Sequence, residues 1–334
     1  MNMHQFFYNS ITVSLPKNII QYLLGFVLFW LTYSYFDMQT FLFSVTGFVL
    51  AYSAVYFFND VVDYEEDKKD KDKRAWKLVA GGMISRNTAI ILGLLFLVTG
   101  LLLSSMVSGW YLNIIVLILF LNFIHSHPKI KLKKKLIPTT INMTVIEFFK
   151  YSSGWFAFTG DLTRFPFWII LTFSVVYSTI YIVYKFKFSG DMIRKYKPYF
   201  GVIAATVLVS YVLSLTLYSF ALPLAILFLM SLSIVVFSVV VGNRFKFMNW
   251  LWIEFIIMPA MIMAFLIISI PFAAQANANL TEKIEEYKDT VYKKLPEDMA
   301  ETLNNLSEPR YSSLDEIEDA INRSVNGTIS SVLK

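Results

Sequence analysis

The chain has 334 residues, of which 56% are hydrophobic and 16% charged, and it carries a formal net charge of +5 with a mean hydropathy of +0.57. These values exclude a soluble globular domain of this length and are typical of a polytopic membrane protein. The sequence contains no cysteine, which excludes disulfide bonds, thiolate metal sites and a cysteine nucleophile.

Apolar stretches long enough to cross about 30 Å of hydrocarbon as helices recur along the chain. They predict an all-α integral membrane fold with nine transmembrane helices. The expected spans are 18–36, 40–58, 87–106, 109–125, 136–158, 166–184, 199–218, 220–241 and 249–270. The residues before the first span lack the features of a cleaved signal peptide, so we expect this span to remain in the mature protein.

The loops on one side of the predicted bundle collect nearly all of its positive charge. Together with Lys17, the loops after spans 2, 4, 6 and 8 hold twenty Lys and Arg residues, whereas the opposite loops hold only Arg164. Positive loops remain on the cytoplasmic side of a membrane. We therefore expect the N-terminus and the charged loops in the cytoplasm and the C-terminus outside. A nucleic-acid partner is not expected, because these charges are spread over short loops without a binding fold.

The segment Tyr56–Arg74 follows span 2 and packs seven acidic and five basic residues into 19 positions. If span 2 continues as a helix, Asn59, Asp63 and Asp67 share one face. Stacked acids repel one another unless a cation compensates them. With no cysteine and only three histidines, a hard, oxygen-ligated cation such as Mg²⁺ is the natural choice. The alternative, a solvated charged loop, remains open for the second half of the segment.

The basic run His127–Leu136 is interpreted mainly as an anchor for anionic lipid headgroups. Such an anchor needs no acidic partner within the protein. His125 and His127 have neither the acidic neighbours nor the helical spacing of a metal site, and we interpret both as interfacial residues.

Span 5 carries two charges, Glu147 and Lys150, three residues apart on one helical face. Charges inside a membrane line a polar cavity or pair with each other. One interpretation makes Lys150 a phosphate ligand that Glu147 orients. The other is an ion pair that only neutralises itself.

The last 60 residues differ in composition from the rest, since they are acidic overall and rich in Asn. Four of the Asn residues open an N-x-Ser/Thr triplet, the acceptor pattern for glycans outside the cell. Helical spacing and a capping box indicate two short amphipathic helices. We therefore divide the chain into a transmembrane domain, 1–274, and an extracytoplasmic helical tail, 275–334, with a possible partner of its own.

The stretch "NDVVDYEED", Asn59–Asp67, resembles the N-D-x-x-D-x-x-x-D signature of the UbiA superfamily of intramembrane prenyltransferases. The stretch "AGGMIS", Ala80–Ser85, resembles the segment that leads from this signature into the next span in that family. The resemblance extends over the predicted spans and omits the tail. It implies nine helices around a central cavity open to the lipid, with Mg²⁺ and the diphosphate of a prenyl donor bound at the Asp-rich helix.

The loop after span 6, "YKFKFSGDMIRKYKPYF", departs from this family. Most of its members carry a second motif there, resembling D-x-x-G-D, whose end Gly190 and Asp191 match. Lys187 stands at the leading Asp and cannot ligate a second Mg²⁺, although it can pair with a phosphate. Asp191 and the lysines of this loop are therefore expected to contact substrate.

A second branch of the superfamily, the decaprenyl-phosphate phosphoribosyltransferases, resembles the chain more closely in spacing. Lys73-Arg74 and Ala80-Gly81 match its K-R and A-G pairs, whereas Trp76-Lys77 replaces its R-P. In span 5, "KYSSG" resembles its R-A-x-A-G and places Lys150 at the Arg. This resemblance implies one Asp-rich motif, which holds Mg²⁺ and the diphosphate of phosphoribosyl diphosphate.

Together, the residues and the resemblance predict a site in which Asp63 and Asp67 hold Mg²⁺, supported by Asn59 and Asp60. Asp60, Asp63 and Asp67 form its expected catalytic group. The expected substrate-binding residues are Asn59, Lys73, Arg74, Lys150, Lys185, Lys187 and Asp191.

Three functions remain open from the sequence. The favoured one is phosphoribosyl transfer from phosphoribosyl diphosphate to an isoprenoid lipid, a polyprenyl phosphate, that arrives through the membrane. The second is transfer of a prenyl group from prenyl diphosphate to an aromatic or glycerol-phosphate acceptor. The third is a non-catalytic membrane scaffold that has kept the fold.

Overall fold

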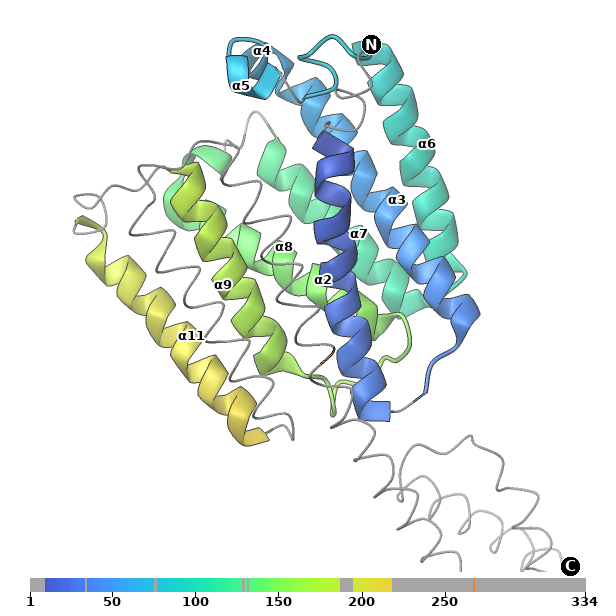
Figure 1. Ribbon diagram of the computed structural model, residues 1–334, viewed down its shortest axis with the longest axis vertical. Helices are drawn as coiled ribbons and strands as arrows, with labels where there is room; N and C mark the ends of the chain where they lie inside the picture. The colour runs from blue at the N-terminus through green and yellow to red at the C-terminus, as the bar shows by residue number, and fades with distance from the viewer. Residues whose placement is uncertain are drawn as a thin grey trace, which may run out of the picture. The chain divides into compact units, whose positions relative to one another are not determined.

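The computed structural model describes residues 10–33, 35–74, 77–127, 130, 132–186, 195–217 and 267. All regular structure in these residues is helical. The long helices are α2 (Ser10–Tyr33), α3 (Met38–Val62), α6 (Arg86–Ser105), α7 (Gly109–Ser126), α8 (Leu136–Phe156), α9 (Phe167–Lys185) and α11 (Lys197–Leu217), and the short ones are α4 (Tyr64–Asp67), α5 (Lys71–Arg74) and the 3-10 turn η1 (Leu132–Lys134). Figure 1 places α4 and α5 together beyond one end of α3.

Each of the first seven expected spans coincides with one long helix, within four residues at either end except at the start of α2, which begins eight residues before the expected span. In the described part of the chain, five helices are long and apolar enough to cross a membrane, namely α2, α3, α6, α7 and α11. The spans expected at 220–241 and 249–270 fall outside the described residues, apart from residue 267, and so does the tail. The fold is therefore helical and membrane-spanning, and the number nine remains a prediction.

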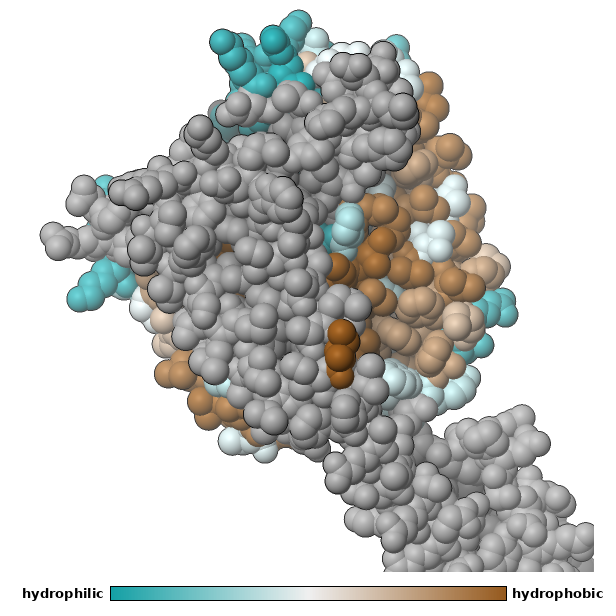
Figure 2. Space-filling view, viewed as in Figure 1, coloured by the Kyte–Doolittle hydropathy of each residue, from teal (hydrophilic) through white to brown (hydrophobic). Residues whose placement is uncertain are grey.

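One face of α6 is apolar and exposed. Ile91, Leu94, Leu95, Val98 and Leu102 follow the spacing of a single helical face and are 49–65% exposed. Figure 2 shows hydrophobic side chains gathered on the side where Figure 1 draws α6 and α3. Such an apolar stripe on a long apolar helix faces lipid.

The loop after α5 packs against the ends of α3 and α6. Phe57 of α3, Val79 of the loop and Ala89 of α6 form a buried cluster. The partly buried residues around it are Val61, Tyr64, Leu78, Ile84, Leu92 and Phe96. This packing keeps the residues that follow the acidic segment against the polar end of α3.

Helices α2 and α8 touch backbone to backbone where each carries a glycine. A Cβ on Gly25 would overlap the Tyr151 carbonyl oxygen, and a Cβ on Gly154 would overlap the Tyr22 carbonyl oxygen. Small residues let membrane helices approach this closely. The polar residues that lie one to two turns before Gly25 on α2 and before Gly154 on α8 are therefore neighbours.

Candidate functional site

The polar end of α3 brings the acidic segment to the edge of the helix bundle. The helix runs through Asn59 and Asp60 to Val62, and Asp63 caps it while its amide donates to the Asn59 carbonyl at 2.9 Å. The amide of Asp67 donates to the Asp63 carbonyl, also at 2.9 Å, so the turn of α4 continues the helical hydrogen bonding beyond the cap. Asn59 and Asp63 are four positions apart and lie on one face of α3.

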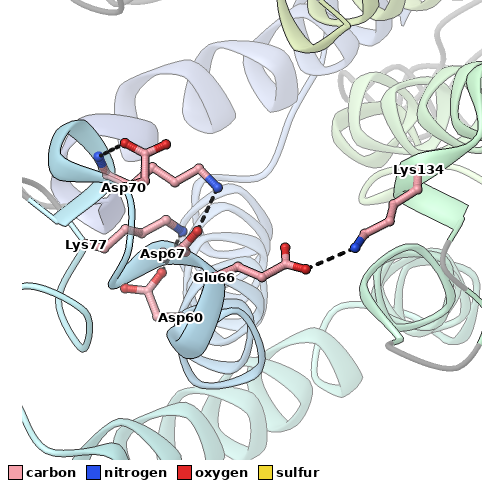
Figure 3. A network of polar contacts seen from close by, with 7 residues as sticks. Asp60, Glu66, Asp67, Asp70, Lys77 and Lys134 are labelled. Carbon is pink, nitrogen blue, oxygen red and sulfur yellow. Dashed lines mark hydrogen bonds and ion pairs between the residues drawn. The ribbon is translucent and has the colours of Figure 1, made fainter.

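Asp60 fastens the following loop to α3. Its side chain is 1% exposed, and its Oδ1 accepts from Lys77 Nζ at 2.7 Å (Figure 3). Its Oδ2 accepts from the Leu78 amide at 3.0 Å. Since both oxygens are engaged, the geometry gives Asp60 a positioning role in the loop. Lys77 had appeared in the sequence only as a departure from a motif, and no pattern there signals its partner.

Asp67 is buried and paired with Lys73. Its side chain is 3% exposed, and Lys73 Nζ donates to its Oδ1 at 2.7 Å (Figure 3). Lys73 is half-buried, and this burial by itself lowers the pKa of its ammonium because it disfavours the charged form. The hydrogen bond to Asp67 and the charges of Asp67, Asp63 and Asp70 prevail, so they raise the pKa of Lys73 above its usual value. Three carboxylates thus act on one cation.

This donor set fits a hard divalent cation. Asp63 and Asp67 offer carboxylate oxygens and Asn59 an amide oxygen, which are ligands that Mg²⁺ accepts. In the described ranges no group of three or more His, Asp or Glu residues is placed so that it could hold a metal ion. One or two carboxylates are sufficient for Mg²⁺ when waters and substrate phosphates complete its coordination.

Two further ion pairs, both largely exposed, connect the acidic segment with other elements. Lys134 of η1 reaches Glu66 at 3.0 Å (Figure 3), and Arg86 at the start of α6 reaches Glu65 at 2.5 Å. One lysine of the basic run thus has an acidic partner within the protein, which a lipid anchor alone would not need. Arg74 ends α5 and is exposed.

Glu147 and Lys150 form an ion pair inside the bundle. The two side chains are 2% and 1% exposed, with Lys150 Nζ at 3.1 Å from Glu147 Oε1. Lys150 also lies 4.6 Å from the ring centroid of Tyr52 on α3. Gln21 of α2 donates to the other Glu147 oxygen at 2.5 Å. The structure thus contains the predicted pair and links it to two further helices.

Lys185 lies at the end of α9, beside the end of α7. Its Nζ is 3.5 Å from His125 Nε2, and His125 Nδ1 is 3.3 Å from Asn142 of α8. His125 is 9% exposed and lies in the last turn of α7, between α8 and α9. Lys187 and Asp191 lie outside the described residues.

Sequence reasoning missed the polar residues of α2 and the tyrosines of α3. Asn18 donates to the Tyr56 hydroxyl at 3.0 Å, and Tyr52 packs on Tyr56 with ring centroids 5.5 Å apart. Tyr52, Tyr56, Asn59 and Asp63 follow one another at helical spacing on one face of α3. Polar residues three apart in the first span were the available signal, since polar groups in membrane helices face the interior.

The chain is similar to known proteins over most of its length. The sequence profile of the UbiA prenyltransferase family matches residues 19–255. A comparison with curated proteins gives no match.

Solved structures share the fold. A UbiA homolog from Archaeoglobus fulgidus bound to GPP and Mg²⁺ has a TM-score of 0.58 and 12% identity, and the match covers 78% of this chain and 98% of that chain. The same homolog bound to DMAPP and Mg²⁺ has a TM-score of 0.55 and 11% identity, covering 78% and 99%. A digeranylgeranylglyceryl phosphate synthase has a TM-score of 0.52 and 18% identity, covering 79% and 98%. Identities this low establish a shared fold only.

Proposed function

Because the chain belongs to the UbiA prenyltransferase family, it is a transferase, and we propose that it carries out Mg²⁺-dependent transfer from a diphosphate-activated donor to an isoprenoid lipid within the membrane. Family membership sets aside the non-catalytic scaffold. The observation that carries the proposal is the buried Asp67 carboxylate, which is 3% exposed and held by Lys73 at 2.7 Å at the end of α4, the turn that follows α3.

In this proposal Asp63 and Asp67 hold Mg²⁺ together with the donor diphosphate. Bound Mg²⁺ would neutralise the negative charge that grows on the departing diphosphate. Asn59 supports the ligands from one turn earlier on α3. Asp60 is occupied by Lys77 and Leu78, so it keeps the loop in place beneath the site.

The basic residues provide positive potential for the phosphate groups. Lys73 is 45% exposed, which leaves its side chain room to turn from Asp67 toward a bound phosphate. Lys150 and Lys185 come from α8 and α9, and Arg74 from α5. Fixed cations in a site shielded from water stabilise developing negative charge more strongly than they would in solution. Lys187 and Asp191 complete the proposed binding set.

We favour phosphoribosyl diphosphate as donor and a polyprenyl phosphate as acceptor. Lys150 is buried among polar residues, and this supports the choice. The hydroxylated sugar of phosphoribosyl diphosphate needs polar partners in the protein, whereas the hydrocarbon chain of a prenyl diphosphate does not. Prenyl transfer to an aromatic or glycerol-phosphate acceptor is the second candidate. It is favoured by the solved homologs that hold GPP or DMAPP with Mg²⁺.

The proposed topology keeps the acidic segment on the cytoplasmic side and the domain 275–334 outside, where the tail has a partner of its own. Protease access to the tail in right-side-out but not inside-out vesicles would support this orientation. Access from inside-out vesicles alone would reverse it.

One assay tests the function. The purified chain, in lipid with Mg²⁺, is given either phosphoribosyl diphosphate and polyprenyl phosphate or a prenyl diphosphate and candidate acceptors, and released diphosphate is measured. Release with the first pair alone supports the favoured function, and release with prenyl donors alone selects the second. Asp63→Ala abolishes release in either case. Full turnover by Asp63→Ala would refute the metal assignment.

A further inference from the structure

Three polar atoms lie buried without a hydrogen-bond partner in the described part of the chain. They are Asn18 Oδ1 and Gln21 Oε1 of α2 and the Tyr151 hydroxyl of α8. The three residues are 3%, 2% and 0% exposed. A buried polar group without a partner costs free energy, and hydrocarbon has no water to supply the missing bond. We call these three residues, together with Glu147 and Lys150, the α2–α8 polar cluster.

The members of this cluster occupy one place in the fold. Asn18 and Gln21 are three positions apart on α2, and Glu147 and Tyr151 are four apart on α8, so each pair shares a helical face. Gln21 joins the two faces by donating to Glu147 at 2.5 Å. The Tyr151 hydroxyl lies beside the Gln21 side chain, at a distance but not in an orientation that suits a hydrogen bond, and it is also near the charge of Glu147.

The hydrogen bond to Glu147 determines what Gln21 can bind. A carboxylate only accepts, so the Gln21 nitrogen must face it and the carbonyl oxygen Oε1 must point elsewhere. That oxygen accepts hydrogen bonds and therefore repels a phosphate oxygen, which is an acceptor too. Its partner must donate. The Tyr151 hydroxyl both donates and accepts, so it can bond to the oxygen of the same donating group.

The cluster is linked to the acidic face of α3. Asn18 donates to Tyr56, which precedes Asn59 by three positions and Asp63 by seven. Seven residues of helix span about 10 Å. Asn18 therefore lies about two turns deeper in the bundle than Asp63, and Lys150, which packs on Tyr52 one turn further along α3, lies about three turns deeper. A substrate whose phosphates lie at Asp63 has to extend along α3 to reach the cluster.

We propose that the α2–α8 polar cluster binds a hydroxyl group of the substrate, with Gln21 accepting its hydrogen bond and Tyr151 completing it, so that Gln21 and Tyr151 select a hydroxylated substrate. This inference rests on the proposed function, since the diphosphate of the donor would lie at Asp63 and Asp67. The hydroxyl belongs either to a sugar-phosphate donor or to a glycerol-phosphate acceptor. The hydrocarbon of a prenyl group does not satisfy the cluster.

The test measures equilibrium binding to the full chain in lipid nanodiscs with Mg²⁺. The donor arm compares phosphoribosyl diphosphate with its 2-deoxy analogue. The acceptor arm compares glycerol 1-phosphate with 3-hydroxypropyl phosphate, which lacks one hydroxyl. We expect the wild-type chain to prefer the hydroxylated ligand about tenfold in one arm, the effect of one good hydrogen bond. The arm that shows the preference identifies the source of the hydroxyl.

Two variants assign the preference to the cluster. Tyr151→Phe and Gln21→Met each reduce it to less than about twofold, because each removes one partner of the hydroxyl. Tyr151→Phe removes a group that has no partner in the ligand-free chain, so its unfolding temperature without ligand stays the same or rises. Thr172→Val is the matched control, since it deletes a buried hydroxyl bonded to Ser210 on other helices, and it leaves the preference unchanged.

Other outcomes overturn the inference. They are the absence of a preference in both arms, or a preference that survives both variants. A fall in the ligand-free unfolding temperature of Tyr151→Phe with the preference intact would assign the hydroxyl a structural role. Failure of the proposed function gives a different result. In that case the binding of a diphosphate donor depends neither on Mg²⁺ nor on Asp63, with or without hydroxyl groups on the donor.

Discussion

The Lys73 ammonium is paired with one carboxylate and influenced by two others. It lies 2.7 Å from Asp67, and the charges of Asp63 and Asp70 also act on it. Two of these carboxylates, Asp63 and Asp67, are the proposed Mg²⁺ ligands. In the proposed site Lys73 would therefore compete with the metal for Asp67, and it would become available to a phosphate once the metal is bound.

Replacing Lys73 separates these two roles. Lys73→Met removes the competitor, so we expect Mg²⁺ to bind about two- to fivefold more tightly without donor, a change typical of a partly exposed ion pair. Donor binding weakens at the same time, because a phosphate partner is lost. Calorimetric titrations with Mg²⁺ alone and with Mg²⁺ plus donor measure both effects. If Mg²⁺ affinity without donor is unaltered, the lysine does not occupy the metal position.

The Asp67–Lys73 pair also has a defined pH range. The folded chain raises the pKa of Lys73 above its ordinary value of 10.5, so the pair stabilises the fold fully below that pH and loses its effect as the pH rises through the folded value. The difference in unfolding temperature between wild type and Lys73→Met is therefore constant from pH 6 to pH 9 and shrinks above about pH 10.5. A difference that already disappears near pH 8 would contradict the pairing.

Asp60 tests the division between structural and catalytic acids. Asp60→Asn leaves Lys77, which is 13% exposed, without its charge partner, and we expect a loss of about 2 kcal/mol in the free energy of unfolding. The double variant Asp60→Asn/Lys77→Met recovers most of this loss. Glu65→Gln is the control, because its pair with Arg86 is largely exposed and contributes little. Equal losses in the two single variants would refute the anchoring role of Asp60.

The Glu147–Lys150 pair can be examined without destabilising the chain. Changing both residues to Met removes two buried charges together, which is often neutral for stability. If Lys150 binds phosphate, the folded double variant loses donor affinity at least tenfold in a direct binding measurement. Unchanged affinity would leave the pair as a self-neutralising contact.

At the scale of elements, the α2–α8 crossing positions Gln21 beside Glu147. Gly25→Ala puts a methyl group against the Tyr151 carbonyl, and overpacking of this kind costs about 1–3 kcal/mol. Gly201→Ala in α11 is the matched control, because a Cβ there meets nothing within 4 Å. Thermal unfolding of both variants checks the difference. A Gly25→Ala chain as stable as the control would show that the helices are further apart.

The helices that the sequence predicted best are those with uniform apolar composition. Long apolar runs predicted α3, α6 and α11 to within a few residues, because run length alone determines whether a helix spans the membrane. The acidic face of α3 followed from helical spacing. The break at Asp63 did not, since a cap depends on how the chain turns into α4.

The candidate site was predictable only in part for the same reason. Polar residues at helical spacing are visible in the sequence, as for Asn59, Asp63 and Asp67, although α3 ends before Asp63 and Asp67 belongs to α4. Partners from separate helices are not, because the contact of Gln21 with Glu147 spans 126 positions and depends on the glycine crossing. The link between Lys134 and Glu66 was likewise hidden, since it joins two loops across 68 positions.

At the scale of the whole molecule, three observations agree with a transferase that works inside the membrane. They are the family, the lipid-facing helix surfaces and the polar interior. A membrane transferase has its acidic segment at one end of α3 and its unsatisfied polar groups about two to three turns deeper. The domain 275–334 is proposed to lie on the opposite side of the membrane from the acidic segment, which separates its role from the transfer reaction.

The most direct test of this account is a calorimetric titration of the full chain with Mg²⁺ in the presence and absence of a diphosphate donor. We expect Mg²⁺ to bind to the wild-type chain more tightly when donor is present, and Asp63→Ala and Asp67→Ala each to abolish this cooperative binding. Donor-dependent Mg²⁺ binding that persists unchanged in both variants would contradict the claim that these carboxylates form the metal site.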